Sequence, residues 1–331
     1  MKATRLPSGS WRCRVRKKIN GQTVDKSFTA ETKGEAEYLA QAWLHGEKKP
    51  RSQKTFREGL EEYISNRYNV LSPSTIKGYR SLQRHSFKAL EPMQIGDITD
   101  EDVQKLINEN ALCYSVKSLK NQLGLIIPVL GRTVKVKLPQ EEKEDIIIPT
   151  EEEAKQILKA IDGSYIECEV LFALMLGLRV SEIVALRWEN IHEHYIDIRG
   201  AIVADEWGNY VYKKANKSDA SRRTVLIPDY LWAKLEQLEK DGERIFNLSP
   251  DALNSAWRRL RKKKGLRPFT LHGLRHYCAS VMLLKGVPDK YAMEILGQST
   301  PGVLKNIYQA TYQSEKDKMQ KQMSDYFSKM G

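Results

Sequence analysis

A histidine and an arginine lie three residues apart in the stretch Thr270-Leu-His272-Gly-Leu-Arg275-His276. If this stretch is helical, His272 and Arg275 lie on one face, because residues three apart on a helix are neighbours. An imidazole that can exchange a proton and a permanently charged guanidinium, both directed at one point, suit a phosphate. His276 lies one turn beyond His272, so we expect one of the two histidines to have a structural role.

Two other basic side chains could bind the same anion. Arg179 lies between an apolar run and a helix expected to begin near Ser181, whose first amides also favour an anion. Lys217 lies in a polar, basic turn that leads into an apolar strand. Lys213 and Lys214 are near enough in sequence to take its place, and the ordinary state of a lysine on a hairpin is simple solvation.

A tyrosine follows the stretch Ile295-Leu-Gly-Gln298-Ser-Thr-Pro301 at position 308. Gly297 is expected to end one helix and Thr300-Pro301 to begin the next, which places Tyr308 two turns inside it. Its hydroxyl can serve as a nucleophile, and the Gln298 amide can donate a hydrogen bond. For any one of the fifteen tyrosines in the chain, packing or stacking is the ordinary alternative.

The elements that must position these residues begin at a capping box, Thr150-x-x-Glu153, which predicts the start of a helix. Beyond it we expect mostly helices with a small antiparallel sheet between Tyr195 and Ile227. Residues 150–331 are therefore predicted to form one catalytic domain with a helical C-terminal tail. The tail has an apolar stripe that either completes the core or packs on a neighbouring protomer, formed by Met319, Met323, Phe327 and Met330.

The first fifty residues alternate in a strand pattern. Trp11, Cys13 and Val15 fall on one face, and arginines fall on the other. A turn at Asn20-Gly21 and a following helical pattern predict a small three-stranded sheet backed by one helix over residues 1–50. The basic face is a candidate DNA surface, with a merely solvated face as the alternative. The candidate DNA-binding residues are Arg12, Arg14, Arg16, Lys17 and Lys18.

Between these segments, residues 54–135 have helical periodicity, including a cap at Thr99 with Asp102 three residues later. We expect an all-helical bundle there. Residues 136–149 include Pro139 and Pro149 and are interpreted as a linker. The predicted fold class is a multidomain α+β protein.

Composition favours a polyanionic partner. The formal net charge is +12 and the isoelectric point is about 9.3, and cations that neutralise phosphates release condensed counterions. The longest apolar run, Val170 to Leu178, is too short to span a bilayer, and residues 1–10 do not resemble a secretory leader. We therefore expect a protein of the cytoplasm, with its four cysteines reduced.

Taken in order, these motifs resemble the tyrosine recombinase, or phage integrase, family. The residues that carry the resemblance are Arg179, Lys217, His272, Arg275, Gln298 and Tyr308. Residues 1–50 look like the arm-site domain of phage and conjugative-transposon integrases, and residues 54–135 look like their SAM-like core-binding domain. The family usually has histidine where this chain has Gln298, which can donate a hydrogen bond but cannot carry a proton.

The resemblance implies metal-independent and ATP-independent cleavage of duplex DNA by Tyr308 through a 3′-phosphotyrosine, with integration or excision of a mobile element as the outcome. His272 would accept the tyrosine proton, Lys217 would protonate the leaving 5′ oxygen, and the two arginines would clamp the phosphate. No cofactor is expected. The pair His192-x-His194 is too small a constellation for a metal site by itself.

The partners implied by the resemblance are arm-type and core-type DNA sites, a homotetramer on DNA, a host DNA-bending protein and an excision factor, in the nucleoid of a bacterial host. Two other functions stay open from the sequence. One is a DNA-binding accessory protein of the same fold that has lost activity, which Gln298 alone motivates. The other is a type IB topoisomerase, for which a basic arm-binding domain is not needed.

Overall fold

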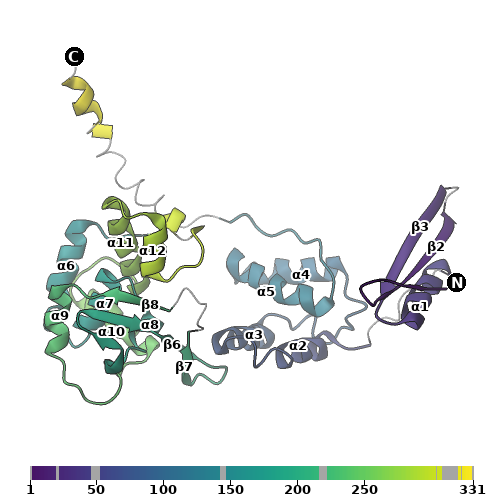
Figure 1. Cartoon of the computed structure of the whole chain (residues 1–331), viewed down its shortest axis with the longest axis horizontal. Coiled ribbons are helices and arrows are strands. Elements are labelled where there is room, and N and C mark those ends of the chain that lie inside the picture. Colours follow the sequence, from purple (N-terminus) through teal and green to yellow (C-terminus); the bar gives the residue numbers. More distant parts are fainter. Residues whose placement is uncertain are drawn as a thin grey trace. The chain divides into compact units, whose positions relative to one another are not determined.

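The computed structural model describes residues 2–19, 22–45, 53–141, 147–215, 222–302, 304–307, 320–321 and 323–329 (Figure 1). The chain divides into two compact units, residues 1–70 with 79–140 and residues 71–78 with 141–331. Within the described ranges, no helix is both long and apolar enough to cross a membrane. Lys217, Tyr308 and the expected turn at Asn20-Gly21 lie outside these ranges.

The N-terminal end of the first unit is a sheet backed by one helix. Strands β1 (Thr4–Arg5), β2 (Trp11–Ile19) and β3 (Gln22–Ala30) pair antiparallel in that order, and α1 (Lys33–His45) follows. Cys13 and Val15 of β2 pack with Ala36 and Ala40 of α1 in a small core. The three-stranded sheet and its helix were predicted from the alternation in β2 and are confirmed.

The rest of the first unit is helical. Its helices are α2 (Phe56–Ser65), α3 (Pro73–His85), whose first residues are grouped with the second unit, α4 (Asp100–Asn110) and α5 (Val116–Leu130). Thr99 caps α4 in a capping box with Asp102, as the sequence predicts. The rings of Phe56 and Phe87 meet edge to face at 5.5 Å in the interior.

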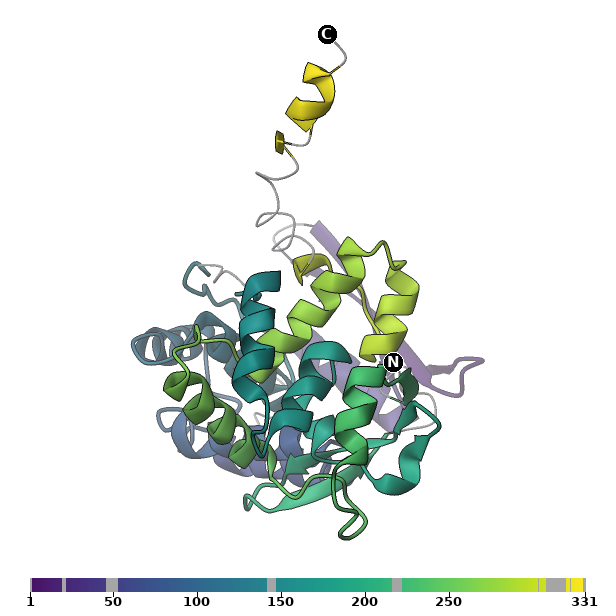
Figure 2. The same cartoon turned by 90° about the vertical axis from the view of Figure 1, so that its left-hand side faces the viewer.

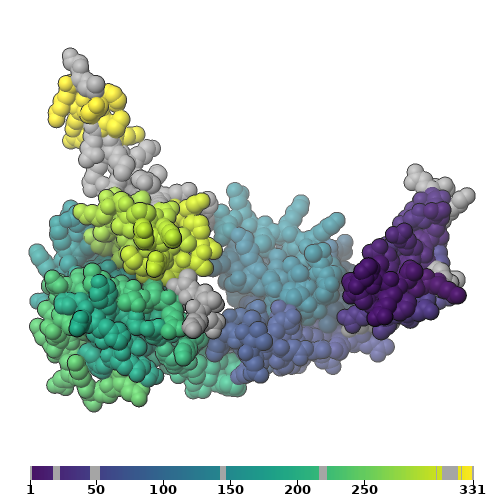
Figure 3. Space-filling view, viewed as in Figure 1, coloured from purple at the N-terminus to yellow at the C-terminus, as the bar shows by residue number. Residues whose placement is uncertain are grey.

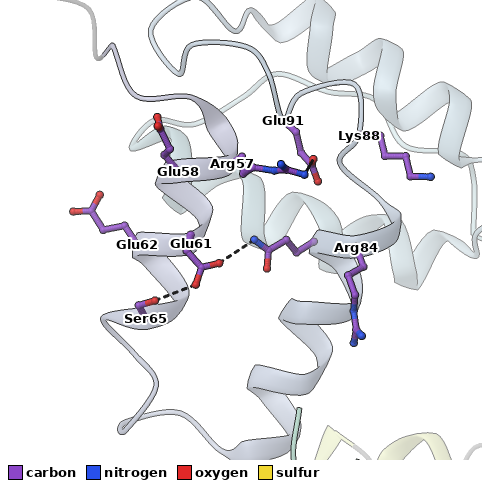
Figure 4. A pocket seen from close by; sticks show the side chains of 9 residues that line it. Arg57, Glu58, Glu61, Glu62, Ser65, Arg84, Lys88 and Glu91 are labelled. Carbon is purple, nitrogen blue, oxygen red and sulfur yellow. Dashed lines mark hydrogen bonds and ion pairs between the residues drawn. The ribbon is translucent and has the colours of Figure 1, made fainter. Parts of the chain in front are cut away.

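A surface hollow of about 840 Å³ lies on this helical part, lined by residues from α2, α3 and the segment that follows α3 (Figure 4). Glu61 accepts hydrogen bonds there from Ser65 at 3.3 Å and from Gln83 at 3.2 Å. Arg57 is directed at Glu91, with 2.8 Å between their charged groups. Its lining has four glutamates against two arginines and one lysine, so the hollow is a poor site for a phosphate.

Most helices of the second unit gather around a large apolar core (Figure 2). The helix α7 (Glu167–Met175) is buried at every position from Glu167 to Leu174 and contacts α9 and α11. A helix that is buried on every side is enclosed by its neighbours, whereas a surface helix buries one face only. The other helices are α6 (Glu151–Ile161), α8 (Val180–Ile183), η1 (Trp188–Asn190), α9 (Asp229–Glu236), α10 (Pro250–Lys263), α11 (Leu271–Leu284) and α12 (Asp289–Leu296).

Two small sheets complete this unit, where the sequence predicted one. Strands β4 (Ile191–His192), β5 (Tyr195–Ile198) and β8 (Arg223–Leu226) form the first, in that order. Strands β6 (Gly200–Ala204) and β7 (Tyr210–Lys214) pair only with each other. The first sheet begins earlier than predicted, because Glu193 and His194 both adopt positive φ and turn the chain without a glycine.

The described chain beyond α12 returns to the helices α11 and α12. Leu304 and Ile307 are completely buried or nearly so and cluster with Ala279 of α11 and with Ala292 and Leu296 of α12. In the space-filling view, the yellow-green chain of α11 and α12 lies against the green and teal chain of the same unit (Figure 3). The residue directly before Tyr308 in sequence is therefore anchored on α12.

Candidate active site

Arg179 occupies the junction between α7 and α8. Gly177 has φ of +64°, and a Cβ atom there would lie 2.5 Å from Leu296, so the chain turns at the one residue type that fits. Arg179 then caps α8 in extended conformation, and its amide donates to Glu182 Oε2 at 2.9 Å. Its side chain, 35% exposed, is the most accessible of the cluster described below.

Arg275 lies on the buried side of α11, the helix that Thr270 caps through the Gly273 amide. Its Nη1 donates to the carbonyl of Gly177 and its Nη2 to that of Leu296, both at 2.6 Å. The side chain is only 3% exposed. The predicted helix over His272 and Arg275 is confirmed, and its N-terminal turn brings Arg275 to the segment before Arg179.

Three consecutive carbonyls at the end of α12 each accept from a different arginine. Ile295 accepts from Arg223 at 2.6 Å, Leu296 from Arg275 at 2.6 Å and Gly297 from Arg179 at 2.8 Å. The last carbonyls of a helix have no partner within it and carry partial negative charge, so cations are favoured there. Gly297 ends α12 with φ of +62°, as predicted.

Glu182 is the carboxylate at the centre of these arginines, and the sequence reasoning did not single it out. It lies 2.7 Å from Arg179, 3.0 Å from Arg223 and 4.0 Å from Arg275. Burial acts to raise the pKa of Glu182, but Arg223 and Arg179 outweigh it and hold the pKa below its ordinary value. The available signal was its spacing, three residues after Arg179 in an apolar helix start.

The cluster has more positive than negative charge. Three guanidinium groups, those of Arg179, Arg223 and Arg275, surround one carboxylate. Burial and the nearby Arg179 cation lower the pKa of Arg275 to about 9, so it remains protonated at neutral pH but lacks full compensation. The carbonyls that accept from its donors carry only partial negative charge, which is less than the full charge of a guanidinium. An anion bound at this point would be stabilised by the whole cluster.

His272 and His276 lie one turn apart on α11, with ring centroids 4.6 Å apart and planes at 77°. Partial burial, together with the Arg275 and Arg179 cations, lowers the pKa of His272 below 6.5. His272 is therefore neutral at neutral pH and able to accept a proton. Burial and His272 lower the pKa of His276 to about 4, and its Nδ1 has no partner among the described residues. His276 has the more enclosed, structural position.

Gln298 follows the glycine that ends α12. Its amide nitrogen in the backbone donates to Met293 at 2.8 Å, which fixes the chain there. The residue is 8% exposed, and its side-chain Oε1 accepts no hydrogen bond from the described part of the chain. This unpartnered atom is an acceptor, and a phosphate group has no proton to donate to it, so a bond from Gln298 to a phosphate would have to come from the amide Nε2.

Both lysines that could replace Lys217 are exposed on β7. Lys214 lines a cavity of about 370 Å³ together with Arg187, Arg199 and Arg222. Lys217 itself lies outside the described residues, between Lys214 and Arg222 in sequence.

The candidate DNA-binding residues of β2 divide between the two faces of the strand. Arg14 and Arg16 are exposed, Arg12 shares their face, and Arg16 pairs with Asp25 across the hairpin at 2.6 Å. Lys17 lies on the opposite face, where its Nζ donates to the carbonyl of Leu44 at the end of α1 at 2.6 Å. The backbone of Lys18 belongs to β2, and its side chain lies outside the description.

His192 and His194 have separate neighbours. His192 lies 3.4 Å from Asp197, and His194 stacks on Trp232 with 4.5 Å between ring centroids. Over the described ranges, no group of three or more histidine, cysteine, aspartate or glutamate side chains could hold a metal ion. All four cysteines are free, and Cys13, Cys168 and Cys278 are buried.

Comparisons with known proteins agree with this architecture. Residues 149–315 match the model of the Phage integrase family, and residues 55–110 match that of the Phage integrase, N-terminal SAM-like domain. A "Tyrosine recombinase XerC-like" protein of Caldanaerobacter subterraneus subsp. tengcongensis is 25% identical, over 93% of each chain. The integrase of Salmonella phage P22 is 27% identical, over 51% of this chain and 45% of its own.

Two solved structures show the same fold. The Tn1549 transposon integrase in complex with transposon right end DNA has a TM-score of 0.66 at 17% identity, over 81% of this chain and 99% of that one. A lambda integrase tetramer bound to a Holliday junction has a TM-score of 0.60 at 17% identity, over 92% and 94% of the two chains. Since the integrase model spans half of the sequence and all of the candidate catalytic residues, this protein belongs to the phage integrase family and is a tyrosine-type site-specific recombinase.

Proposed function

We propose that this recombinase cuts and rejoins duplex DNA through a 3′-phosphotyrosine at Tyr308, and that it thereby integrates or excises a mobile element. The observation that carries the proposal is the cationic cluster of Arg179, Arg275 and Arg223 around the single carboxylate of Glu182. A neutral imidazole, His272, lies on the same helix as Arg275. The cationic cluster can bind an electrophilic phosphate, and the neutral imidazole can accept a tyrosine proton.

The chemistry assigns one role to each residue. The phenol oxygen of Tyr308 bonds to phosphorus while the bond to the 5′ oxygen breaks, which conserves the energy for rejoining. His272 takes the phenol proton, and Lys217 protonates the departing 5′ oxygen. Arg179 and Arg275 stabilise the charge on the non-bridging oxygens. The side-chain amide of Gln298 donates one further hydrogen bond to the phosphate.

We place arm-type DNA contacts on the face of β2 that Arg12, Arg14 and Arg16 share, and core-type contacts on the helical part of the first unit. A homotetramer on DNA is the proposed assembly, and the likeness in fold to lambda integrase in its tetramer on a Holliday junction supports it. A host DNA-bending protein and an excision factor would complete the reaction in the nucleoid of a bacterial cytoplasm.

Covalent trapping tests the mechanism. Wild type and Tyr308→Phe are incubated in EDTA with nicked duplex DNA from the two ends of the protein's own mobile element. We expect a DNA adduct on Tyr308 by peptide mass spectrometry, and none with the variant, because phenylalanine lacks the attacking oxygen.

Tyr312→Phe, four residues further along the chain, is the matched control and should form the adduct at the wild-type rate. If wild-type protein binds this DNA and forms no adduct, the non-catalytic DNA-binding function replaces the proposed one. If it forms the adduct but only relaxes supercoils, without new junctions, topoisomerase activity replaces recombination.

A further inference from the structure

Arg223 is a buried arginine that the mechanism above does not use. It is the first residue of β8, and its side chain is 3% exposed. Side chains alternate along a strand, so Arg223 and Val225 face the interior while Thr224 and Leu226 face outward. The preceding residue, Arg222, is exposed. A charge buried this deeply is retained at a cost in hydration and needs specific partners.

The partners of Arg223 are the same groups that hold the two phosphate-clamping arginines. Its Nη1 and Nη2 donate to Glu182 Oε1 at 3.2 Å and to Oε2 at 3.0 Å, in a two-pronged pair. Its Nε donates to the carbonyl of Ile295 at 2.6 Å. The next two carbonyls along the chain accept from Arg275 and Arg179.

Glu182 is shared between Arg179 and Arg223 at both of its oxygens. Oε1 accepts from the Arg179 side chain at 2.7 Å, and Oε2 accepts from the Arg179 amide at 2.9 Å. Arg223 binds each of the same two oxygens. The plane of the carboxylate is therefore fixed by Arg223, and the Arg179 guanidinium takes its orientation from that plane.

We propose that Arg223 is a positioning residue for strand cleavage. It holds Glu182 and the last turn of α12 in the arrangement that directs the accessible Arg179 at the scissile phosphate. It also ties β8, the strand that follows the Lys217 segment in sequence, to the same helix end. The proposal rests on the proposed function, since it assigns to Arg223 the support of the phosphate clamp.

If the ion pair of Arg223 with Glu182 contributed to folding alone, a different result would be expected. Its loss lowers the melting temperature and leaves the rate of the bound complex unchanged. Loss of a positioning residue lowers the rate at full DNA occupancy, and does so because charge on the phosphate is stabilised less well.

The first measurement is the single-turnover rate of adduct formation, with protein in excess over the nicked substrate used above. We expect Arg223→Gln to be about 10-fold to 100-fold slower than wild type, the usual effect of removing a partner that orients a reacting group. DNA affinity should stay within about 2-fold, because the Arg223 guanidinium is bonded to Glu182 and to the carbonyl of Ile295 and is assigned no contact with DNA. Arg223→Lys keeps the charge but cannot span both oxygens of Glu182, so it should give an intermediate rate.

The second measurement isolates the stabilisation of negative charge on the scissile phosphate. A substrate with a methyl group in place of one non-bridging oxygen of the scissile phosphate is neutral and needs less charge stabilisation. On this substrate, Arg223→Gln and wild type should react within about 3-fold of each other. An equal loss on both substrates would overturn the proposal, because it would indicate a general structural defect.

The third measurement tests the route through Glu182. In a protein that already carries Glu182→Gln, adding Arg223→Gln should lower the single-turnover rate only a little further. The effects of substituting two residues in contact do not add when one residue acts through the other. Full additivity of the two effects would overturn this route.

Lys234→Gln is the matched control for a lost ion pair, because Lys234 of α9 pairs with Asp162 and Glu167 away from the cluster. It should lower the melting temperature and keep the wild-type rate. If wild type forms the adduct and Arg223→Gln forms it at the same rate, the inference on Arg223 fails and the proposed function stands. If wild type forms no adduct, both proposals fail.

Discussion

At the scale of single residues, the site depends on unequal protonation of groups that lie close together. Arg223 and Arg179 outweigh burial and hold Glu182 ionised, while partial burial and the arginine cations keep His272 neutral. One charged and one neutral group at the same cationic site can divide the work of binding and proton transfer.

The pH dependence of cleavage follows from the lowered pKa of His272. Only the neutral imidazole accepts a proton, so the rate should rise with pH through a midpoint below the ordinary histidine pKa of 6.5. The measurement is the single-turnover rate of adduct formation between pH 5 and 8. His272→Ala should be slow at every pH. A wild-type midpoint above 6.5 would contradict the assignment of His272 as the acceptor.

Gln298 offers a second prediction at this scale. Gln298→Leu keeps the size of the side chain but removes the donor, so cleavage at saturating DNA should fall by about 10-fold. Gln298→His restores a donor and should keep the rate within a few-fold of wild type. The same cleavage assay measures both. An unchanged rate in Gln298→Leu would show that this amide does not contact the phosphate.

The sequence could supply only part of this site. Arg179, His272 and Arg275 stand in recognisable motifs, and the structure places the two arginines around one carboxylate. Arg223 could not be told from its neighbour Arg222, because where the strand begins and which of its residues face inward depend on register, which only the folded sheet decides. Glu182 was missed for a related reason, since its partner Arg223 is distant in sequence.

At the scale of elements, two helices of the second unit do the positioning. The end of α12 receives three arginines on consecutive carbonyls, and Gly177, which follows the end of α7, turns the chain toward Arg179. The helix α7 is enclosed by its neighbours, so its polar residues are costly. Glu169 is 5% exposed, and burial raises its pKa to about 7.

Replacing Glu169 with glutamine should stabilise the protein at alkaline pH. The folded state favours the protonated acid, so its contribution to stability is present below pH 4.5 and is lost as pH rises through about 7. Glu169→Gln removes this loss, and the gain above pH 7 should be about 1 to 3 kcal/mol. Urea unfolding at pH 5 and pH 8 measures it.

Glu152→Gln on the exposed face of α6 serves as the control and should change stability equally little at both pH values. A gain for Glu169→Gln that is the same at pH 5 and pH 8 would mean that ionisation of Glu169 is not its cause.

Elements with local signals were predictable, and those without were not. The capping boxes at Thr99 and Thr150 fixed the starts of α4 and α6 because their hydrogen bonds are made within four residues. The turn between β4 and β5 was missed because Glu193 and His194 adopt positive φ against their intrinsic preference. The separation of β6 and β7 from the other sheet is a matter of strand pairing, which alternation alone does not specify.

At the scale of the whole molecule, the excess of 12 positive charges is spread unevenly. The hollow in the helical part of the first unit has slightly more acid than base in its lining, while arginines gather on one face of β2. Net charge therefore favours a polyanionic partner, and only the local distribution of charge indicates which surfaces meet it.

Neutralising the outer face of β2 should change how salt affects binding. For Arg12→Gln with Arg14→Gln, the slope of log affinity against log salt should decrease by about 1 to 2, because each lost phosphate contact retains about one counterion. Fluorescence anisotropy on duplex DNA from the element ends gives the slope. Lys17→Gln is the matched control, since its ammonium is bonded to Leu44 on the other face. Equal effects of both changes would contradict the assignment of that face.

The three carbonyls at the end of α12 also bear on the choice of laboratory buffer. They hold the arginine side chains in place without cancelling their charge, so the DNA-free enzyme keeps an uncompensated cationic site beside an exposed part of Arg179. Dianions such as sulfate and inorganic phosphate are then competitors for the place of the scissile group. Cleavage in these buffers should be slower than in chloride at the same ionic strength, and increasing the DNA concentration should restore it.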